Sequence, residues 1–315
     1  MPSHRRKVAH VPITPHPETR DLKPLPVPEF AGTLEAYSHA LEAVLDDEEL
    51  QRAKKVTADF EATTGPRLDE ALRERAAQRE AEGTNWLSDE WYSSYLSNRG
   101  SLPLTTNVGF QLNLPSEASG LDRVVERIQR VLAVHLQAAS RDLPEYVDAR
   151  GNRITQDQWF VFAGGLRHPQ PGQDEIVQST QGAANREIGV FVNGRLFALR
   201  VTDGDSTPIS ADALRRGLEA VLERGSSSRE LDFNAASLLG SGELSDLLPD
   251  LLAQGDNESV YNRLRDLLFT VDLVDVDGGA QDTDAERIHQ LSFLPRGAWA
   301  YKPLSYQFSV SDDWT

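Results

Sequence analysis

The sequence contains no cysteine and only one methionine in 315 residues. Without cysteine the chain cannot form a disulfide, use a thiolate nucleophile or build a cysteine-ligated zinc site. Basic residues are also scarce, since 32 Lys and Arg stand against 49 Asp and Glu, for a formal net charge of −17. This acidic balance argues against nucleic acid or an anionic membrane as the partner.

Long apolar runs are missing too. No window approaches the ~18 apolar residues that a transmembrane helix requires. The first twenty residues carry a basic cluster, Arg5 to Lys7, but no apolar segment typical of a secretory signal. These absences predict a soluble, cytoplasmic protein with no membrane span.

Several common catalytic signatures are absent as well. The sequence has no Gly-x-Ser-x-Gly elbow, no phosphate-binding Walker loop and no His-x-x-Glu metal motif. The run Asp275 to Gly279 is similar to the start of a calcium loop, but no glutamate follows at the twelfth position. We interpret it as a solvated turn and predict no metal site.

The pattern of what is present divides the chain into three parts. Residues 1–20 are rich in proline, which predicts an extended or disordered arm. Residues 21–100 are predicted to form a helical segment of three helices. The first begins near Thr33, the second runs from a cap at Asp46-Asp47 to Phe60, and the third covers 67–81. Gly65-Pro66 is expected to end the second helix. Residues 101–315 mix strand and helix patterns and predict an α/β domain.

Within this last part, the most definite local signal is the hairpin over residues 188–201, whose two β runs are joined by Asn193-Gly194. Amphipathic helices are predicted over 121–136, after Ser210, over 238–252 and over 260–268. Strands are predicted over 107–114, 268–273 and 304–310. His135 lies beside the apolar face of the first helix and is interpreted as a core or boundary histidine.

The stretch from Asn85 to Arg99 holds four large aromatic residues, Trp86, Trp91, Tyr92 and Tyr95. Each buried ring can contribute ~1.5–3 kcal/mol of transfer free energy, so the stretch is expected to dock against the rest of the protein. Two interpretations stay open: a corner that packs between structural layers, or one wall of a binding tunnel.

The same stretch resembles the opening third of the choline/carnitine O-acyltransferase family in its Asn-Trp-Leu-Ser, Glu-Trp, Tyr-Leu, Arg and Leu-Pro residues. The resemblance is colinear over roughly residues 22 to 310. It continues through Gln158, Phe162, Arg167, Pro169 and Asp174, through the 188–201 hairpin, and into the final strand after Trp299.

The resemblance implies a fold and a set of site residues. The fold would be an α/β sandwich like that of CoA-dependent acyltransferases, with a mixed sheet and packed helices, preceded by a helical segment and amounting to half of the two-domain family fold. Trp91, Tyr92 and Tyr95 would form a wall of the substrate tunnel. Arg167 and Asp174 would lie in a Gly- and Pro-rich loop able to contact a ligand.

The resemblance also implies a reaction in which an acyl group passes between CoA and a small hydroxyl substrate, with acyl-CoA as co-substrate. In the family a histidine acts as general base on that hydroxyl. None of the seven histidines here lies in the family's Tyr-Glu-His type of motif, so no catalytic residue is assigned. Near the positions of a family arginine and tryptophan, this chain has Glu243 and Leu247.

These observations predict one subunit of a split, hetero-oligomeric acyltransferase that is inactive alone. A second polypeptide would supply the histidine, the CoA site and the C-terminal half, pairing with the open edge of the 304–310 strand. Two alternatives stay open: a non-catalytic binding or scaffold protein with the family fold, and a truncated remnant.

Overall fold

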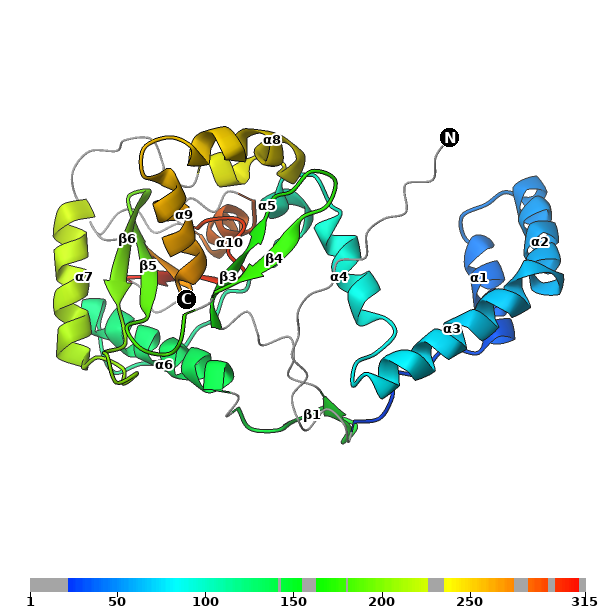
Figure 1. Cartoon of the computed structure of the whole chain (residues 1–315), viewed down its shortest axis with the longest axis horizontal. Helices are drawn as coiled ribbons and strands as arrows, with labels where there is room; N and C mark the ends of the chain where they lie inside the picture. The colour runs from blue at the N-terminus through cyan, green and yellow to red at the C-terminus, as the bar shows by residue number, and fades with distance from the viewer. Residues whose placement is uncertain are drawn as a thin grey trace. The chain divides into compact units, whose positions relative to one another are not determined.

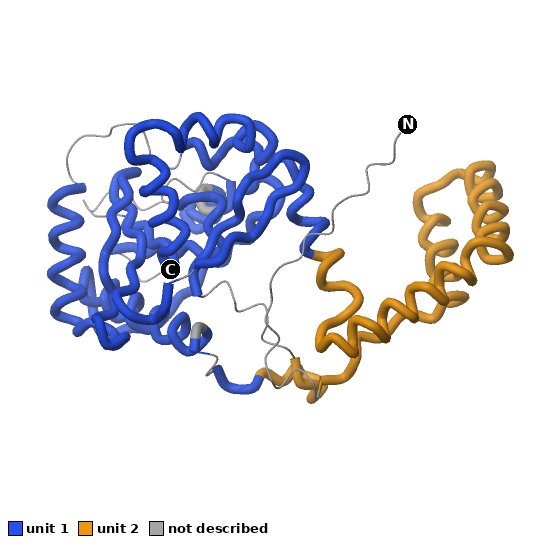
Figure 2. The backbone as a smooth tube through the Cα atoms, viewed as in Figure 1, with its two compact units in different colours: residues 1–13, 92–145, 156–315 blue, residues 14–91, 146–155 orange. Residues whose placement is uncertain are grey.

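The computed structural model describes residues 22–140, 143–154, 163–179, 181–225, 235–274, 283–293 and 298–311. The chain divides into two compact units, coloured separately in Figure 2. One, here called the helical unit, comprises residues 14–91 and 146–155; the other, the α/β unit, includes residues 92–145 and 156–315. The predicted arm over 1–20 and the turn at 275–279 lie outside the described residues.

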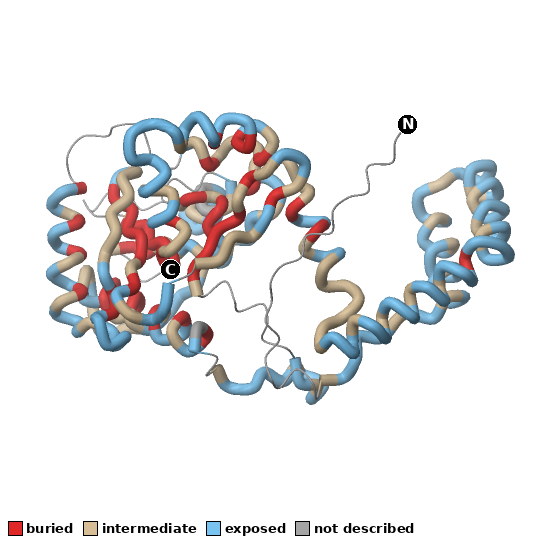
Figure 3. Tube along the Cα trace, in the orientation of Figure 1, coloured by how far each residue is buried: buried red, intermediate tan, exposed pale blue. Residues whose placement is uncertain are grey.

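The helical unit contains α1 (Phe30–Leu41), α2 (Asp47–Ala62), α3 (Thr64–Ala81) and a short hairpin of β1 (Tyr146–Val147) and β2 (Arg153–Ile154). The predicted cap of α2 is confirmed, because Asp46 Oδ1 accepts the backbone N–H of Glu49 at 2.9 Å. Gly65-Pro66 was expected to end this helix, but both residues lie in the first turn of α3, where proline has no donor to lose. Neither α1 nor α2 buries a residue fully, and Figure 3 accordingly shows both helices in pale blue and tan without red.

The centre of the α/β unit is a mixed four-stranded sheet of order β6-β5-β7-β8. Its strands are β5 (Glu187–Val192), β6 (Arg195–Arg200), β7 (Thr270–Val274) and β8 (Ser305–Ser309). The first two are antiparallel, whereas β5, β7 and β8 run parallel to one another. The predicted α/β class with a mixed sheet is therefore confirmed (Figure 1).

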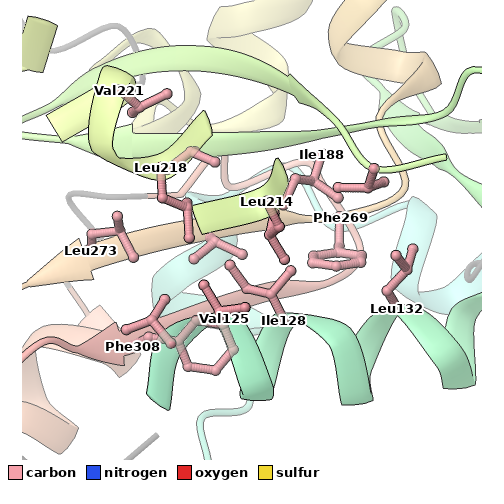
Figure 4. Close-up of a cluster of buried hydrophobic side chains, with 14 of the residues drawn as sticks. Val125, Ile128, Leu132, Ile188, Leu214, Leu218, Val221, Phe269, Leu273 and Phe308 are labelled. Atoms are coloured by element: carbon pink, nitrogen blue, oxygen red, sulfur yellow. The ribbon is translucent and has the colours of Figure 1, made fainter. Parts of the chain in front are cut away.

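Two amphipathic helices pack against one face of this sheet. They are α6 (Gly120–Ser140) and α7 (Ala211–Gly225), which confirms two of the predicted helices. Figure 4 shows how their apolar side chains meet those of the strands: Ile128 and Leu218 lie with Phe269, Leu273 and Phe308 in one cluster. Because strand side chains alternate between faces, every second residue of β7 and β8 joins this core.

Shorter elements complete the α/β unit and enclose a second, smaller core. They are the part of α4 (Ser88–Leu96) from Tyr92 onward, α5 (Leu102–Thr105), a hairpin of β3 (Gly165–His168) and β4 (Glu175–Gln178), a 3-10 helix η3 (Ala235–Leu238), α8 (Ser241–Leu252), α9 (Asn257–Asp266) and α10 (Asp284–Phe293). The strand expected over 107–114 is not formed, since residues 107–112 have no regular structure. Trp299 and Tyr301 pack with leucines of α5, α8 and α9 in this second core.

Candidate functional site

A cavity of about 630 Å³ lies within the α/β unit. This volume falls in the range of small-molecule sites, ~300–1,000 Å³. Two unbroken runs of chain supply most of its lining, residues 106–112 and residues 298–307, and α5, α10 and the β3-β4 hairpin supply the remainder together with Tyr92. Most of the lining surface is apolar, and the polar groups are arginine, lysine, tyrosine, serine, threonine and amide side chains.

Only one of the three predicted tunnel-wall residues lines this cavity. Tyr92 does so, whereas Trp91 is 56% exposed and Tyr95 is 45% exposed. Trp91 and Tyr95 are four residues apart and therefore share one face of α4, while Ser93 and Leu96 form the buried face. The stretch was expected to dock against the rest of the protein, and the structure shows that two of its four aromatic rings, Trp91 and Tyr95, stay largely exposed. The tunnel role of the three residues remains a prediction.

The predicted loop residues Arg167 and Asp174 come together in a buried ion-pair cluster. Asp174 has a completely buried side chain, and its Oδ2 accepts the Nε–H of Arg167 at 2.6 Å. Its Oδ1 pairs with Arg99 and also accepts a hydrogen bond from the hydroxyl of Ser241. We call these four residues the Asp174 cluster.

The Asp174 cluster joins three separate segments. Arg99 follows α4, Arg167 and Asp174 belong to the β3-β4 hairpin, and Ser241 begins α8. Further bonds strengthen the joint: Arg167 Nη2 donates to the carbonyl of Asn98 at 2.9 Å, and Arg99 Nη2 donates to that of Ser241 at 3.0 Å. The cluster therefore fixes the segment after α4 beside the cavity, where Arg167 forms part of the lining but Asp174 does not.

The sequence offered no means of finding Arg99 and Ser241 as partners of Asp174. They lie 75 and 67 residues away from it along the chain. The only signal was that Arg99 belongs to the motif that carries the family resemblance. Ligand contact by Arg167 and Asp174 remains a prediction.

Another cation of the lining, Lys302, is buried against the C-terminal end of α9. Its Nζ donates to the carbonyl oxygens of Leu264, Arg265 and Leu267, at 3.0, 3.0 and 2.5 Å. These carbonyls end a helix and have no partners within it, so the lysine acts as a C-terminal cap. Burial, and after it the positive charge of Arg186, lowers the pKa of Lys302 to about 7.

Replacing Lys302 with methionine should change how stability depends on pH. The unfolded lysine titrates near ~10.4, so between about pH 7 and that value the unfolded chain binds more protons than the folded one. Stability from this group therefore rises with pH over that window. The free energy of unfolding of wild type minus that of Lys302→Met should increase by about 2–3 kcal/mol from pH 6 to pH 9 in urea titrations.

Lys55 of α2 provides the control for this prediction, because it is exposed and forms none of these bonds. The difference between wild type and Lys55→Met should stay constant over the same range. A constant difference for Lys302→Met as well would mean that the buried lysine keeps an ordinary pKa.

The wall formed by β8 carries two buried polar pairs. On the helix side, the hydroxyl of Tyr306 lies 3.1 Å from Nε2 of His135, and burial raises the pKa of this tyrosine to about 12. On the opposite face, Gln307 Nε2 donates to Oδ2 of Asp272 at 3.0 Å. Burial raises the pKa of Asp272 to about 6, although this hydrogen bond opposes the shift.

Comparison with known proteins places this arrangement in a family. The sequence model described as "Choline/Carnitine o-acyltransferase" matches residues 25–313, which is most of the chain. The chain belongs to the choline/carnitine O-acyltransferase family. The family assignment made from the motifs is therefore confirmed.

Relatives within the choline/carnitine O-acyltransferase family are much longer. Carnitine O-acetyltransferase of Columba livia is 30% identical over 62% of this chain and 32% of its own length. The Homo sapiens enzyme of that name is 29% identical over the same shares. Choline O-acetyltransferase of Homo sapiens is 23% identical over 96% of this chain and 42% of its own length. The chain thus spans about a third to two fifths of the length of these relatives.

No histidine is among the described residues that line the cavity. His135 is completely buried against Tyr306, so its interpretation as a core histidine is confirmed. His168 is half-buried, and its Nδ1 lies 2.8 Å from the hydroxyl of Tyr261. A general base of the kind the family resemblance implies is therefore not placed at the cavity by the described part of the chain.

Over the described ranges, no group of three or more His, Cys, Asp or Glu side chains is arranged to hold a metal ion. In the same ranges, no helix has the length and apolar character needed to cross a bilayer.

Proposed function

We propose that this chain provides the N-terminal part of a choline/carnitine-type O-acyltransferase. The reaction would transfer an acyl group between CoA and a small hydroxyl substrate, with acyl-CoA as the co-substrate. A second polypeptide would supply the histidine that takes the proton from the hydroxyl, together with the remainder of the family fold. The chain alone would then be inactive.

The observation that carries this proposal is the family match over residues 25–313 combined with the composition of the cavity. The cavity offers apolar walls and hydrogen-bonding groups, which suit substrate binding. Among its described lining residues it offers no imidazole, which general base catalysis of this kind requires. Binding groups on this chain and a base on another would together make a working site.

The Asp174 cluster supports the proposal at a second level. A catalytic site needs its binding groups held within a fraction of an ångström, and rigid supports achieve this. The cluster ties the segment after α4 to the β3-β4 hairpin and α8 through buried charge-assisted bonds. Tyr92 and Arg167 would therefore present a preformed wall to an incoming substrate.

The proposal is tested by reconstitution. The chain is purified alone and together with the product of the adjacent reading frame, and thiol release from acetyl-, octanoyl- and palmitoyl-CoA is measured with carnitine or choline as acceptor. Activity should appear only in the mixture. Tyr92→Ala should lower that activity at least tenfold, whereas Tyr37→Ala, a change in the helical unit at a 54% exposed residue, should not.

Failure of every donor and acceptor pair in a mixture that forms a stable complex would refute the enzyme proposal. A complex is confirmed first by size-exclusion chromatography with light scattering. Confirming the complex before the activity assay distinguishes a complex that forms but is inactive from two chains that do not bind each other.

The second candidate is a binding or scaffold protein that has kept the family fold. Two residues of α8 favour this candidate. Glu243 and Leu247 are exposed and lie near the positions where the family resemblance implies an arginine and a tryptophan, so these two family residues are replaced. Calorimetry separates the two candidates. Heat of binding with acyl-CoA or a quaternary-ammonium alcohol, without turnover in the complex, would support the binding module.

A further inference from the structure

The three cations that line the cavity are each bound by other groups of the protein. Arg167 pairs with Asp174 at 2.6 Å, and Arg287 pairs with Asp284 at 3.2 Å. Lys302 donates to three carbonyl oxygens at the end of α9. None of the described residues that line the cavity is Asp or Glu. The lining therefore offers a ligand no carboxylate, and its cations are already occupied.

The uncharged polar side chains of the lining are also directed to partners within the protein. The hydroxyl of Tyr301 donates to the carbonyl of Leu239 at 3.1 Å, for example. In six such side chains a hydroxyl or amide group lies within hydrogen-bond distance of another protein group: Asn107, Gln111, Tyr301, Ser305, Tyr306 and Gln307. A ligand that took over one of these bonds would replace it rather than add to it, so the net gain would be small.

The surface that remains for a ligand is mainly carbon. Aliphatic side chains reach the cavity from five separate segments: Leu102, Val108, Ile176, Ile288 and Leu304. Val108 is 71% exposed and Ile288 is 45% exposed, so the cavity opens to solvent beside them and a ligand can enter there. Burial of an apolar ligand against such a lining is favoured by the hydrophobic effect.

The substrates of the proposed reaction have three chemically distinct parts. The phosphates of CoA need cations that are free to bind them. The quaternary ammonium group of choline or carnitine needs a carboxylate or the open faces of aromatic rings. Two lining rings already pack on rings of the protein, since Trp299 contacts Tyr261 and Tyr306 contacts Phe269 and Phe308. The uncharged acyl chain is the part that matches this cavity.

The size of the cavity indicates a chain much longer than acetyl. An apolar cavity of about 150 Å³ takes one benzene molecule. A cavity of about 630 Å³ holds roughly four times as much, on the order of 25 heavy atoms. An acetyl group would leave nearly all of this volume empty. A chain of about eight to sixteen carbon atoms would fill roughly a third to two thirds of it.

We propose that this cavity binds the aliphatic chain of the acyl donor, so that the donor is an acyl-CoA with a medium or long chain rather than acetyl-CoA. Binding of an uncharged aliphatic chain follows from the lining alone, whereas its assignment to acyl-CoA rests on the proposed function. The phosphates of CoA and the charged groups of the acceptor bind outside this cavity.

Linear alcohols test the binding of an aliphatic chain to the isolated protein. Hexan-1-ol, octan-1-ol and decan-1-ol are titrated into protein with labelled isoleucine methyl groups. The NMR signals of Ile176 and Ile288 should shift because both residues line the cavity. Those of Ile128 and Ile188 should not, because both are completely buried in the main core. Affinity should rise about fourfold per methylene group, as ~0.8 kcal/mol per buried CH₂ predicts.

Two results of this titration would overturn the proposal. One is the absence of shifts at Ile176 and Ile288 with decan-1-ol. The other is an affinity that does not depend on chain length, because an aliphatic chain that is buried must contribute through its length.

A matched pair of variants locates the alcohol. Ile288→Asp places a carboxylate in the lining, where an aliphatic chain would have to desolvate it. Val134→Asp makes a similar change on α6, outside the lining, at a residue that is 43% exposed. With the signal of Ile176 as the readout, Ile288→Asp should weaken octan-1-ol binding at least tenfold and Val134→Asp less than twofold. Equal affinities for the two variants would place the alcohol outside the cavity and refute the proposal.

Competition identifies which part of the substrates the cavity takes. Octanoyl-CoA should displace octan-1-ol, whereas CoA without an acyl group, carnitine and choline should not. Displacement by CoA, carnitine or choline would show that the cavity binds a charged group. Failure of octanoyl-CoA to displace the alcohol would refute the assignment to the acyl donor.

The reconstituted mixture separates this inference from the proposed function. In an active mixture, kcat/KM for octanoyl-CoA or palmitoyl-CoA should exceed that for acetyl-CoA at least tenfold. Turnover of acetyl-CoA with equal or higher kcat/KM would keep the proposed function and refute the chain-length inference. Binding of octan-1-ol and octanoyl-CoA in the cavity, without turnover of any donor by the complex, would refute the proposed function and support the aliphatic site.

Discussion

Replacing Asp174 with asparagine should lower the free energy of unfolding of the α/β unit by about 3–5 kcal/mol. The carboxylate pairs with Arg99 and Arg167, and its side chain has no exposure at all. Asparagine keeps the shape of the side chain but removes its charge. Its Nδ2 would replace one carboxylate oxygen and place an N–H donor against the donors of Arg99, Arg167 or Ser241. Arg167, whose side chain is 10% exposed, would then keep a buried positive charge without a carboxylate.

The loss is measured by urea denaturation followed by tryptophan fluorescence, since Trp299 is buried in the adjacent core. Asp250→Asn is the matched control, because Asp250 is exposed on α8, and its effect should stay within about 0.5 kcal/mol. A loss below about 1 kcal/mol for Asp174→Asn would show that carbonyl oxygens and water stabilise the charges of Arg99 and Arg167 in the absence of the Asp174 carboxylate.

Replacing Phe269 with alanine should cost a similar amount, about 3–5 kcal/mol. Phe269 is completely buried just before β7, and its ring centroid lies 4.4 Å from that of His135 and 5.2 Å from that of Tyr306. Removing the ring leaves a cavity between the sheet and α6. It also removes apolar cover from the hydrogen bond between His135 and Tyr306.

Phe269→Leu separates the cavity from the loss of apolar character. Leucine restores much of the volume, so its cost should be below about 1.5 kcal/mol. Equal costs for the two variants would mean that the contacts with the two neighbouring rings, rather than the filled volume, stabilise this part of the core.

Local signals in the sequence predicted much of the sheet and its helices. The hairpin of β5 and β6 was predicted from Asn193-Gly194, and both residues adopt positive φ, 50° and 77°, as a type I′ turn requires. The spacing of apolar residues predicted α6 and α7 because those helices bury one face each. Such elements are encoded within a window of ten to twenty residues.

Elements whose form depends on distant partners were not predicted. The alternation of Val108, Phe110 and Leu112 indicated a strand, but a strand needs a neighbour, and among the described residues no strand pairs with residues 107–112. The Asp174 cluster joins residues 67 to 75 positions apart through single polar side chains, which leave no periodic pattern. The cavity likewise depends on how the runs 106–112 and 298–307 meet, which no local signal reports.

The helical unit is discontinuous in sequence, since it is built from residues 14–91 and 146–155, and α4 continues across the boundary at Trp91 and Tyr92. No single truncation point therefore isolates either unit. A cut after residue 91 would divide a helix and leave the β1-β2 hairpin behind with the α/β unit. Exchanging the helical unit between homologous proteins by recombination accordingly requires a second pair of junctions, on either side of residues 146–155.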